Sequence, residues 1–213
     1  MRLIPRPAGD SQIPAYGAPE AAIAALAHAA RYGAWRTEPR GQVPSLPGVQ
    51  AADARALVTA FLHREPGGGW LPPDKTADLL HCYGIRPVDA EPALSDGTEV
   101  KIGVIDDRVF GPLVVFGPGD HAVRLTPLTD IDADALIRSV DAALLGQRGV
   151  PATDLETLRE LLLRVSRLAD DLPEVTELEL NPVITKPHGV FAMDARVKLT
   201  PCPPQDPFLR RLR

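Results

Sequence analysis

Cysteine is scarce in this sequence, and long apolar runs are missing. Cys82 and Cys202 are the only cysteines among 213 residues. Their wide separation favours neither a disulfide framework nor a zinc site, so the reducing cytosol is the expected compartment. No apolar run is long enough to cross a bilayer, and residues 1–10 lack the apolar core of a signal peptide. The sequence therefore predicts a cytoplasmic protein without a membrane segment.

An excess of positive charge is also missing. The chain carries 23 Lys and Arg residues against 28 Asp and Glu residues, a formal net charge of −5, which gives no electrostatic footprint for nucleic acid. The five histidines show no metal-ligand spacing, and no serine or cysteine stands in a nucleophile-elbow context. The glycine run at 67–70 is not followed by a Lys-Ser or Lys-Thr pair, so it predicts a helix terminator rather than a phosphate loop.

Apolar residues are plentiful, at 45% of the chain, which is enough for one ordinary domain or two small ones. Amphipathic patterns predict one helix over 18–36, another over 50–65, and a third that begins after Pro73 and stops at Gly84. These patterns divide the chain into a lead-in with a linker helix, a helical region and a C-terminal subdomain: residues 1–48, 49–98 and 99–213.

Runs rich in β-branched residues begin after the third predicted helix. Three such runs predict strands, and the next two amphipathic segments predict helices with capping boxes, Thr129 with Asp132 and Thr153 with Glu156. Two alternating stretches then predict a final pair of strands. The order β-β-β-α-α-β-β predicts an α+β fold, in which two helices pack on a mainly antiparallel sheet. We expect residues 99–197 to form a self-contained core.

The last two predicted strands gather oxygen ligands on one face. In "ELELNPVI" the side chains of Glu177, Glu179 and Asn181 share a face, because strand side chains alternate. The turn signal "TKPHG" brings Asp194 back beside Glu179 or Asn181. Carboxylate and amide oxygens suit Mg²⁺, although a solvated sheet face is the commoner reason for such a pattern. Pro182 gives up a ladder donor, which predicts a sheet edge or a bulge.

Two loops are candidates for contact with an anion. Arg148 stands between two glycines just past a predicted helix end, where its guanidinium either grips an anion or covers the last helix carbonyls. The loop at 115–121 follows a strand and contains glycine, which can turn backbone N–H groups toward phosphate. Asp120 in that loop would repel a phosphate, so a plain hairpin turn is favoured there.

Four long stretches together resemble a known family: "EVKIGVIDDRVFGPLVVFGPG", "RLTPLTDIDADALIRSVDAALLGQRG", "LRELLLRVSRLADDLPEVTELELNPVI" and "GVFAMDARVKL". They are similar to the ATP-grasp domain of NDP-forming acyl-CoA synthetases, relatives of the succinyl-CoA synthetase β subunit. Earlier, "LPPDKTADLLHCYGI" looks like the opening helix of that domain. The closing "DPFLRRLR" resembles the end of large fused members that add an acetyltransferase module.

The resemblance implies roles for the residues singled out above. In the family, the Asn of the "Leu-Asn-Pro" strand and an Asp on the returning strand bind the Mg²⁺ of MgATP. These positions are Asn181 and Asp194 here, with Glu179 as a nearby acid. Arg148 would face the nucleotide or a partner domain. The implied partner is a CoA-ligase domain or subunit, and the implied reaction is acyl-CoA formation with ATP.

One departure from the family pattern limits this expectation. Family members insert a long segment with two phosphate-binding lysines after the "YGI" strand, whereas only residues 86–98 fill that interval here. The resemblance therefore implies a truncated, partial ATP-grasp domain of an acetate-CoA type ligase. We expect its binding of Mg²⁺ and ATP to be weak or lost, and its catalysis alone to be incomplete. The alternatives are a non-catalytic interaction or regulatory module, and a chain that acts in trans with a separate CoA-ligase chain.

Overall fold

The computed structural model describes residues 2–5, 12–88, 97–118, 122–144, 154–187 and 189–202. The chain divides into two compact units, residues 1–40 and 41–213. None of the helices in the described ranges is both long and apolar enough to span a membrane.

The first unit contains a short hairpin and one helix. Strands β1 (Arg2–Pro5) and β2 (Gln12–Ala15) pair antiparallel. Helix α1 (Pro19–Thr37) confirms the predicted helix and starts with proline, whose fixed φ is pre-organised for a first helical position. No residue of α1 is buried, and Ile23 and Leu26 are 68% and 72% exposed. The apolar side chains of this helix therefore have no burying partner among the described residues of its own unit.

From β4 onward the second unit has the predicted order of elements, whereas a short strand at Gly69–Trp70, in the stretch read as a helix terminator, was not predicted. Its helices are α2 (Ala51–Arg64), α3 (Pro73–Cys82), α4 (Asp130–Leu144) and α5 (Leu155–Asp171). Its strands are β3 (Gly69–Trp70), β4 (Thr98–Asp107), β5 (Gly111–Gly117), β6 (Ala122–Leu125), β7 (Val175–Lys186), β8 (Gly189–Ala192) and β9 (Ala195–Leu199). The returning strand that the sequence predicted is split into β8 and β9.

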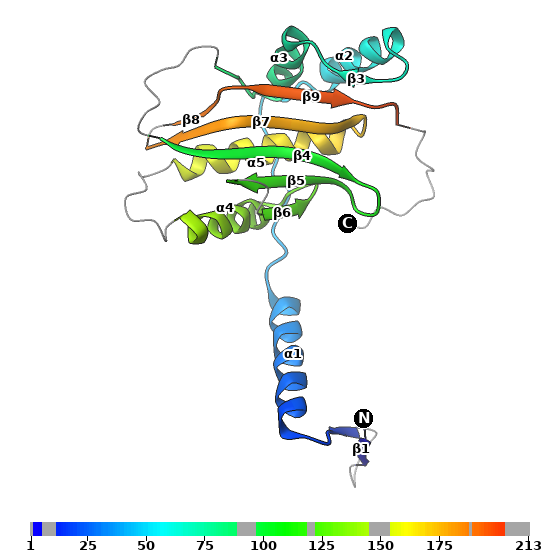
Figure 1. Cartoon of the computed structure of the whole chain (residues 1–213), viewed down its shortest axis with the longest axis vertical. Coiled ribbons are helices and arrows are strands. Elements are labelled where there is room, and N and C mark those ends of the chain that lie inside the picture. The colour runs from blue at the N-terminus through cyan, green and yellow to red at the C-terminus, as the bar shows by residue number, and fades with distance from the viewer. Residues whose placement is uncertain are drawn as a thin grey trace. The chain divides into compact units, whose positions relative to one another are not determined.

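The strands of the second unit form one seven-stranded antiparallel sheet. Its order is β3-β9-β7-β4-β5-β6, and β8 also pairs with β7. Helix α5 runs along one face of the sheet with α4 beside it near β6, while α2 and α3 lie near β9 (Figure 1). We call this helix-covered side the core face, and the opposite side, on which Figure 1 shows no helix, the outer face. The predicted α+β fold is confirmed.

Alternation along β7 separates the two faces. Leu178 and Leu180 are fully buried. Glu177 and Glu179, which alternate with them along the strand, are only half-buried. The core also contains buried residues of α2 and α3, among them Ala54. The expectation of a self-contained core over 99–197 was therefore too narrow, because the amphipathic stripes of both early helices bury against the same sheet.

The helix caps match one prediction and correct another. At α4 the Asp132 N–H donates to Thr129 Oγ1 at 3.1 Å and the Thr129 N–H donates to Asp132 Oδ2 at 3.1 Å, which is the predicted capping box. At α5 the cap is Asp154, whose Oδ1 accepts from the Thr157 N–H at 3.1 Å. The box proposed one residue earlier was wrong, because the Asp154 carboxylate suits a helix N-terminus at least as well as a hydroxyl. Thr153 itself lies outside the described residues.

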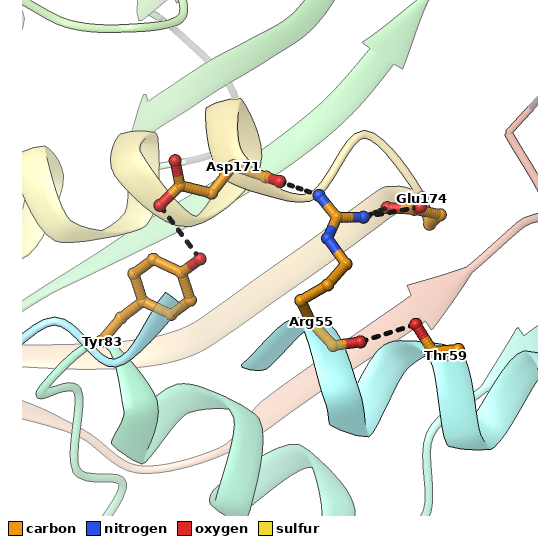
Figure 2. A network of polar contacts seen from close by, with 5 residues as sticks. All are labelled: Arg55, Thr59, Tyr83, Asp171 and Glu174. Carbon is orange, nitrogen blue, oxygen red and sulfur yellow. Dashed lines mark hydrogen bonds and ion pairs between the residues drawn. The ribbon is translucent and has the colours of Figure 1, made fainter. Parts of the chain in front are cut away.

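A polar network joins the early helices to the junction between α5 and β7 (Figure 2). Arg55 on α2 donates to both carboxylate oxygens of Glu174 at 2.7 Å and to the Asp171 carbonyl. Tyr83, just past α3 and fully buried, donates its hydroxyl to Asp171 Oδ2 at 3.2 Å. The Arg55 pair is partly exposed and contributes little by itself. The buried Tyr83 ring combines apolar burial with a satisfied hydroxyl, so it is the stronger anchor of the network.

Replacing Tyr83 by phenylalanine tests this anchor. We expect Tyr83→Phe to lower the free energy of unfolding by about 1 kcal/mol at pH 7, because the partly buried Asp171 carboxylate loses a donor. Equilibrium urea denaturation followed by circular dichroism measures the change. Tyr32→Phe is the matched control, since Tyr32 is exposed on α1, and it should leave the transition of the second unit unchanged.

The pH dependence of the same pair of proteins gives a second readout. Burial, followed by the charge of Asp171, raises the pKa of Tyr83 above its usual value of about 10. A raised folded-state pKa contributes stability that is fully present below the unfolded pKa and is lost as the pH rises. The stability advantage of wild type over Tyr83→Phe should therefore be fully present at pH 7 and be lost as the pH rises above about 10, the unfolded-state pKa of tyrosine. A difference that widens with pH would contradict the assignment.

Candidate functional site

The candidate site lies where the returning strand is interrupted. Leu180 on β7 pairs with Ala195 on β9, and Val183 on β7 pairs with Ala192 on β8. These two pairs belong to the same register, so β8 and β9 follow β7 as one return strand across the interruption. The hairpin predicted from the "TKPHG" turn is thereby confirmed.

Asn181 stands opposite Asp194 in this interruption. The Asn181 N–H donates to the Asp194 carbonyl at 3.1 Å. Residues directly opposite on antiparallel strands point to the same face, and both residues are exposed. Asp194 Oδ1 accepts from the Ala195 N–H at 2.8 Å, which restrains its carboxylate. Of the two neighbours predicted for Asp194, it is Asn181 that lies beside it.

A bulge in the sheet accompanies this site. The β4–β7 register shifts between Val100 and Ile102. On β4 only Lys101 lies opposite the two residues Asn181 and Pro182 of β7. Two residues opposite one is the arrangement of a β-bulge. A bulge lets β7, a central strand, accommodate a residue without a ladder donor, which confirms the prediction made from Pro182. Bulges commonly re-aim side chains near functional sites.

Two ion pairs cover the acidic residues of β7. Lys101 Nζ lies 2.8 Å from Glu179 Oε1, and Lys198 Nζ lies 2.5 Å from Glu177 Oε1. Glu179 therefore enters the site as the partner of a lysine on β4. Sequence reasoning missed Lys101, although a single lysine inside the apolar run "EVKIGVID" was a usable signal. Lys101 balances the negative charge of Glu179, which would otherwise repel an anion.

An aromatic side chain marks the β3 end of the same sheet. The Trp70 ring lies 5.2 Å from the Arg196 guanidinium carbon and 5.7 Å from Lys198 Nζ. Both distances fall within the range of a cation–π contact. Trp70 is 44% exposed, so the ring and its two cations remain accessible to solvent.

The donor set of the site is compatible with a magnesium ion. Asn181 offers an amide oxygen and Asp194 a carboxylate, and Glu179 supplies a second carboxylate that is bound to Lys101. In the described part of the chain, no group of three or more His, Cys, Asp or Glu side chains is placed to hold a metal ion. Magnesium commonly takes one or two protein carboxylates and completes its shell with water or phosphate oxygens. These side chains fit such a partial shell.

The outer face changes character from β7 toward β6. Beyond the ion pairs its exposed side chains are apolar: Ile105, Val123 and Leu125 are 44%, 38% and 53% exposed. Between the charged and the apolar part of this face, Gly103 on β4 pairs with Glu179 on β7. Because Gly103 has no side chain, no group projects from this position of the sheet next to the ion pairs. The site is thus bordered by charge on one side and by an apolar surface on the other.

Two predicted anion contacts cannot be placed. Arg148 lies outside the described residues, and so do residues 119–121 of the glycine loop. The nucleotide-facing role of Arg148 stays a prediction.

Comparison with known proteins identifies the family. A family model described as an ATP-grasp domain matches residues 85–199, just over half of the chain. This chain belongs to the ATP-grasp family. The matched segment begins just after α3 and runs through β9, so it contains the interrupted strand pair and the Lys101–Glu179 pair.

Curated relatives of this ATP-grasp chain include acyl-CoA ligases. The β subunit of ADP-forming acetate–CoA ligase I of Pyrococcus furiosus is 37% identical over 48% of this chain and 49% of the relative. The β subunit of ligase II of the same organism is 39% identical over 51% of each chain. The chain spans about half the length of these relatives.

Solved structures of one further ligase share the fold. The apo form of the dinucleotide-forming acetyl-coenzyme A synthetase 1 of Ca. Korarchaeum cryptofilum is 26% identical, with a TM-score of 0.56 over 68% of this chain and 99% of that one. The same synthetase in complex with coenzyme A and Mg-AMPPCP aligns at 22% identity over 68% of this chain and 99% of that one, also with a TM-score of 0.56. This second likeness concerns the fold alone.

Gly103→Ala tests how tightly the sheet is packed beside the site. An added Cβ would lie 2.9 Å from Val115 Cγ2 and 3.0 Å from the Leu178 carbonyl oxygen. Because strands flank β4 on both sides, we expect the free energy of unfolding to fall by about 1–3 kcal/mol. Gly33→Ala is the control, since nothing lies within 4 Å of its Cβ position. Equal urea midpoints for Gly103→Ala and wild type would show that the strands part easily here.

Proposed function

We propose that this chain supplies the metal-binding half of the ATP-grasp domain of an NDP-forming acyl-CoA ligase. The observation that carries the proposal is the placement of Asn181 opposite Asp194 within one continuous strand register. The acetate–CoA ligase β subunits among its relatives support the reaction class. The synthetase whose apo form is 26% identical to this chain has also been solved with Mg-AMPPCP, which supports the choice of a magnesium nucleotide as ligand.

In this proposal the residues of the interruption have separate roles. The Asn181 amide oxygen and the Asp194 carboxylate hold Mg²⁺, and Glu179 is the nearby acid. Bound Mg²⁺ supplies the charge neutralisation on which phosphoryl transfer largely depends. Lys101 keeps the Glu179 carboxylate from repelling phosphate, because the pair carries no net charge. Arg148 is the proposed cation facing the nucleotide or the partner domain.

In this proposal the chain alone does not complete the ligase reaction. Only residues 86–98 occupy the interval where the resembled family carries its phosphate-binding lysines. Positioning and charge neutralisation provide most of the acceleration of phosphoryl transfer, so a site without those lysines holds Mg²⁺ and ATP weakly and does not complete the reaction. A CoA-ligase domain or subunit is the partner that the complete reaction requires.

A second candidate function is favoured by one contact. Glu179 is already bound to Lys101 at 2.8 Å, so an internal ion pair occupies the position of the third oxygen ligand. A non-catalytic interaction or regulatory module that keeps the ATP-grasp fold would retain such a pair and bind no nucleotide. Metal binding therefore separates the two candidates.

Manganese binding tests the metal site directly. Paramagnetic Mn²⁺ should broaden NMR signals centred on Asn181 and Asp194, and the Asn181→Ala plus Asp194→Ala variant should lose this broadening. We expect a dissociation constant on the order of millimolar, as in other loosely held oxygen sites, and tighter binding of Mn²⁺ than of Mg²⁺.

The matched control removes two carboxylates elsewhere. Asp74→Ala plus Asp78→Ala changes two exposed acids of α3 and should leave the broadening in place. Broadening that is centred elsewhere, or that survives the Asn181 and Asp194 substitutions, would reject the metal site and favour the non-catalytic module.

An activity assay tests the limit on catalysis. The purified chain with ATP, CoA, Mg²⁺ and acetate or propionate should form no acyl-CoA above background, measured by liquid chromatography. An intact ADP-forming acetate–CoA ligase is the positive control. Steady product formation in proportion to the amount of this chain would show that the proposed limit is wrong.

A further inference from the structure

A second candidate binding site lies between α2 and α3. A cavity of about 110 Å³ opens there, and its walls are mostly apolar, with Leu57 and Phe61 from α2, Leu71 from the connection and Leu79 from α3. None of these residues belongs to the interrupted strand pair of the candidate metal site. An apolar cavity offers water too few hydrogen-bond partners to hold it firmly, so an apolar group is the favoured occupant.

Two cations also line this cavity, one from each helix. Arg64 comes from α2 and Lys75 from α3. Lys75 Nζ lies 2.8 Å from Asp78 Oδ2 and 3.6 Å from Asp74 Oδ2, and the hydrogen bond to Asp78 is the main cause that raises the pKa of Lys75. Lys75 therefore stays charged, but its charge is balanced by two carboxylates. Arg64 donates its Nε–H to the Ala60 carbonyl at 3.3 Å, and no carboxylate of the described residues pairs with it.

We propose that this cavity binds a short-chain aliphatic monocarboxylate of about five or six carbon atoms. The size follows from the volume, which is somewhat smaller than the roughly 150 Å³ engineered apolar cavity that binds benzene. The aliphatic tail lies among the leucines, and the carboxylate meets the Arg64 guanidinium, whose planar fork suits a carboxylate. Because Asp74 and Asp78 neutralise Lys75, Arg64 is the cation of this wall that is available to the ligand carboxylate.

The site takes a ligand that is distinct from the proposed magnesium nucleotide. A nucleotide is too large for a cavity of about 110 Å³. A peptide segment would need an extended groove rather than a cavity that admits one aliphatic tail. Because α2 and α3 also pack on the sheet through the core, occupancy of this cavity would stiffen the helix pair.

The test uses hexanoate as the probe and the full chain as the protein. Methyl signals of Leu57, Leu71 and Leu79 should shift saturably in a ¹H–¹³C NMR titration with hexanoate. Hexanol is the neutral comparison, and it should bind more weakly because it lacks the charge that Arg64 recognises. Ala60→Leu should fill the cavity and reduce hexanoate binding at least tenfold. Ala52→Leu, a change of the same size at an exposed position of α2 outside the cavity, should not.

Arg64→Gln measures the charge contribution. We expect it to weaken hexanoate binding by about two- to fivefold, the range for a partly exposed ion pair, and to leave hexanol binding unchanged. Arg108→Gln, which removes an exposed cation of the β4–β5 turn, should leave both unchanged. If Ala60→Leu fails to fold, Leu57→Phe serves as the second cavity-filling variant.

The proposal is overturned by any of three results. The first is the absence of saturable shifts of these methyl signals. The second is undiminished hexanoate binding in the folded cavity-filling variants. The third is hexanol binding as strong as hexanoate binding, which would leave an apolar cavity without anion recognition. None of these results bears on manganese binding at Asn181 and Asp194, so the two proposals fail separately.

Discussion

Strand β7 is hydrogen-bonded along both of its edges, and the arrangement of the second unit depends on this pairing. β4 lies along one edge, and β9 followed by β8 lies along the other. With this register Leu178 and Leu180 enter the core and Glu177 and Glu179 reach the outer face. A slip of one residue would exchange the two sets, placing carboxylates in the core. Neighbours on both sides make that slip costly, so the register is strongly specified.

The same pairing explains why the candidate site lies in the middle of a strand rather than in a loop. A proline within a doubly paired strand requires a local irregularity, and Pro182 has one opposite Lys101. The irregularity coincides with the break between β8 and β9, so Asn181 and Asp194 meet where the ladder is least regular. Rigid pairing on either side then holds the backbone of both residues. Binding groups on such a scaffold are positioned more precisely than groups on a free loop.

The sequence was informative where side-chain periodicity determines structure. The order of strands and helices along the chain from β4, the earlier helices and the hairpin that carries Asp194 followed from alternation, apolar stripes and turn residues, whereas β3 was not predicted. The sequence left open whether Asp194 returns beside Glu179 or beside Asn181, because that choice depends on where the turn places the register. It also missed Lys101 and the Tyr83–Asp171 contact, since both join residues far apart in the chain. Pairwise contacts of this kind leave no periodic signal in one sequence.

The edge strand β6 affects how readily the isolated chain associates with other molecules. Among the described strands β6 ends the sheet, and two of its side chains, Val123 and Leu125, are exposed and apolar. An unpaired strand edge of this kind can add a strand from another molecule, and apolar side chains strengthen such an association. Arg124 lies between them, with its guanidinium bound to the Val123 carbonyl, and it introduces charge into an otherwise aggregation-prone segment. The short length of β6, four residues, limits intermolecular strand addition in the same way.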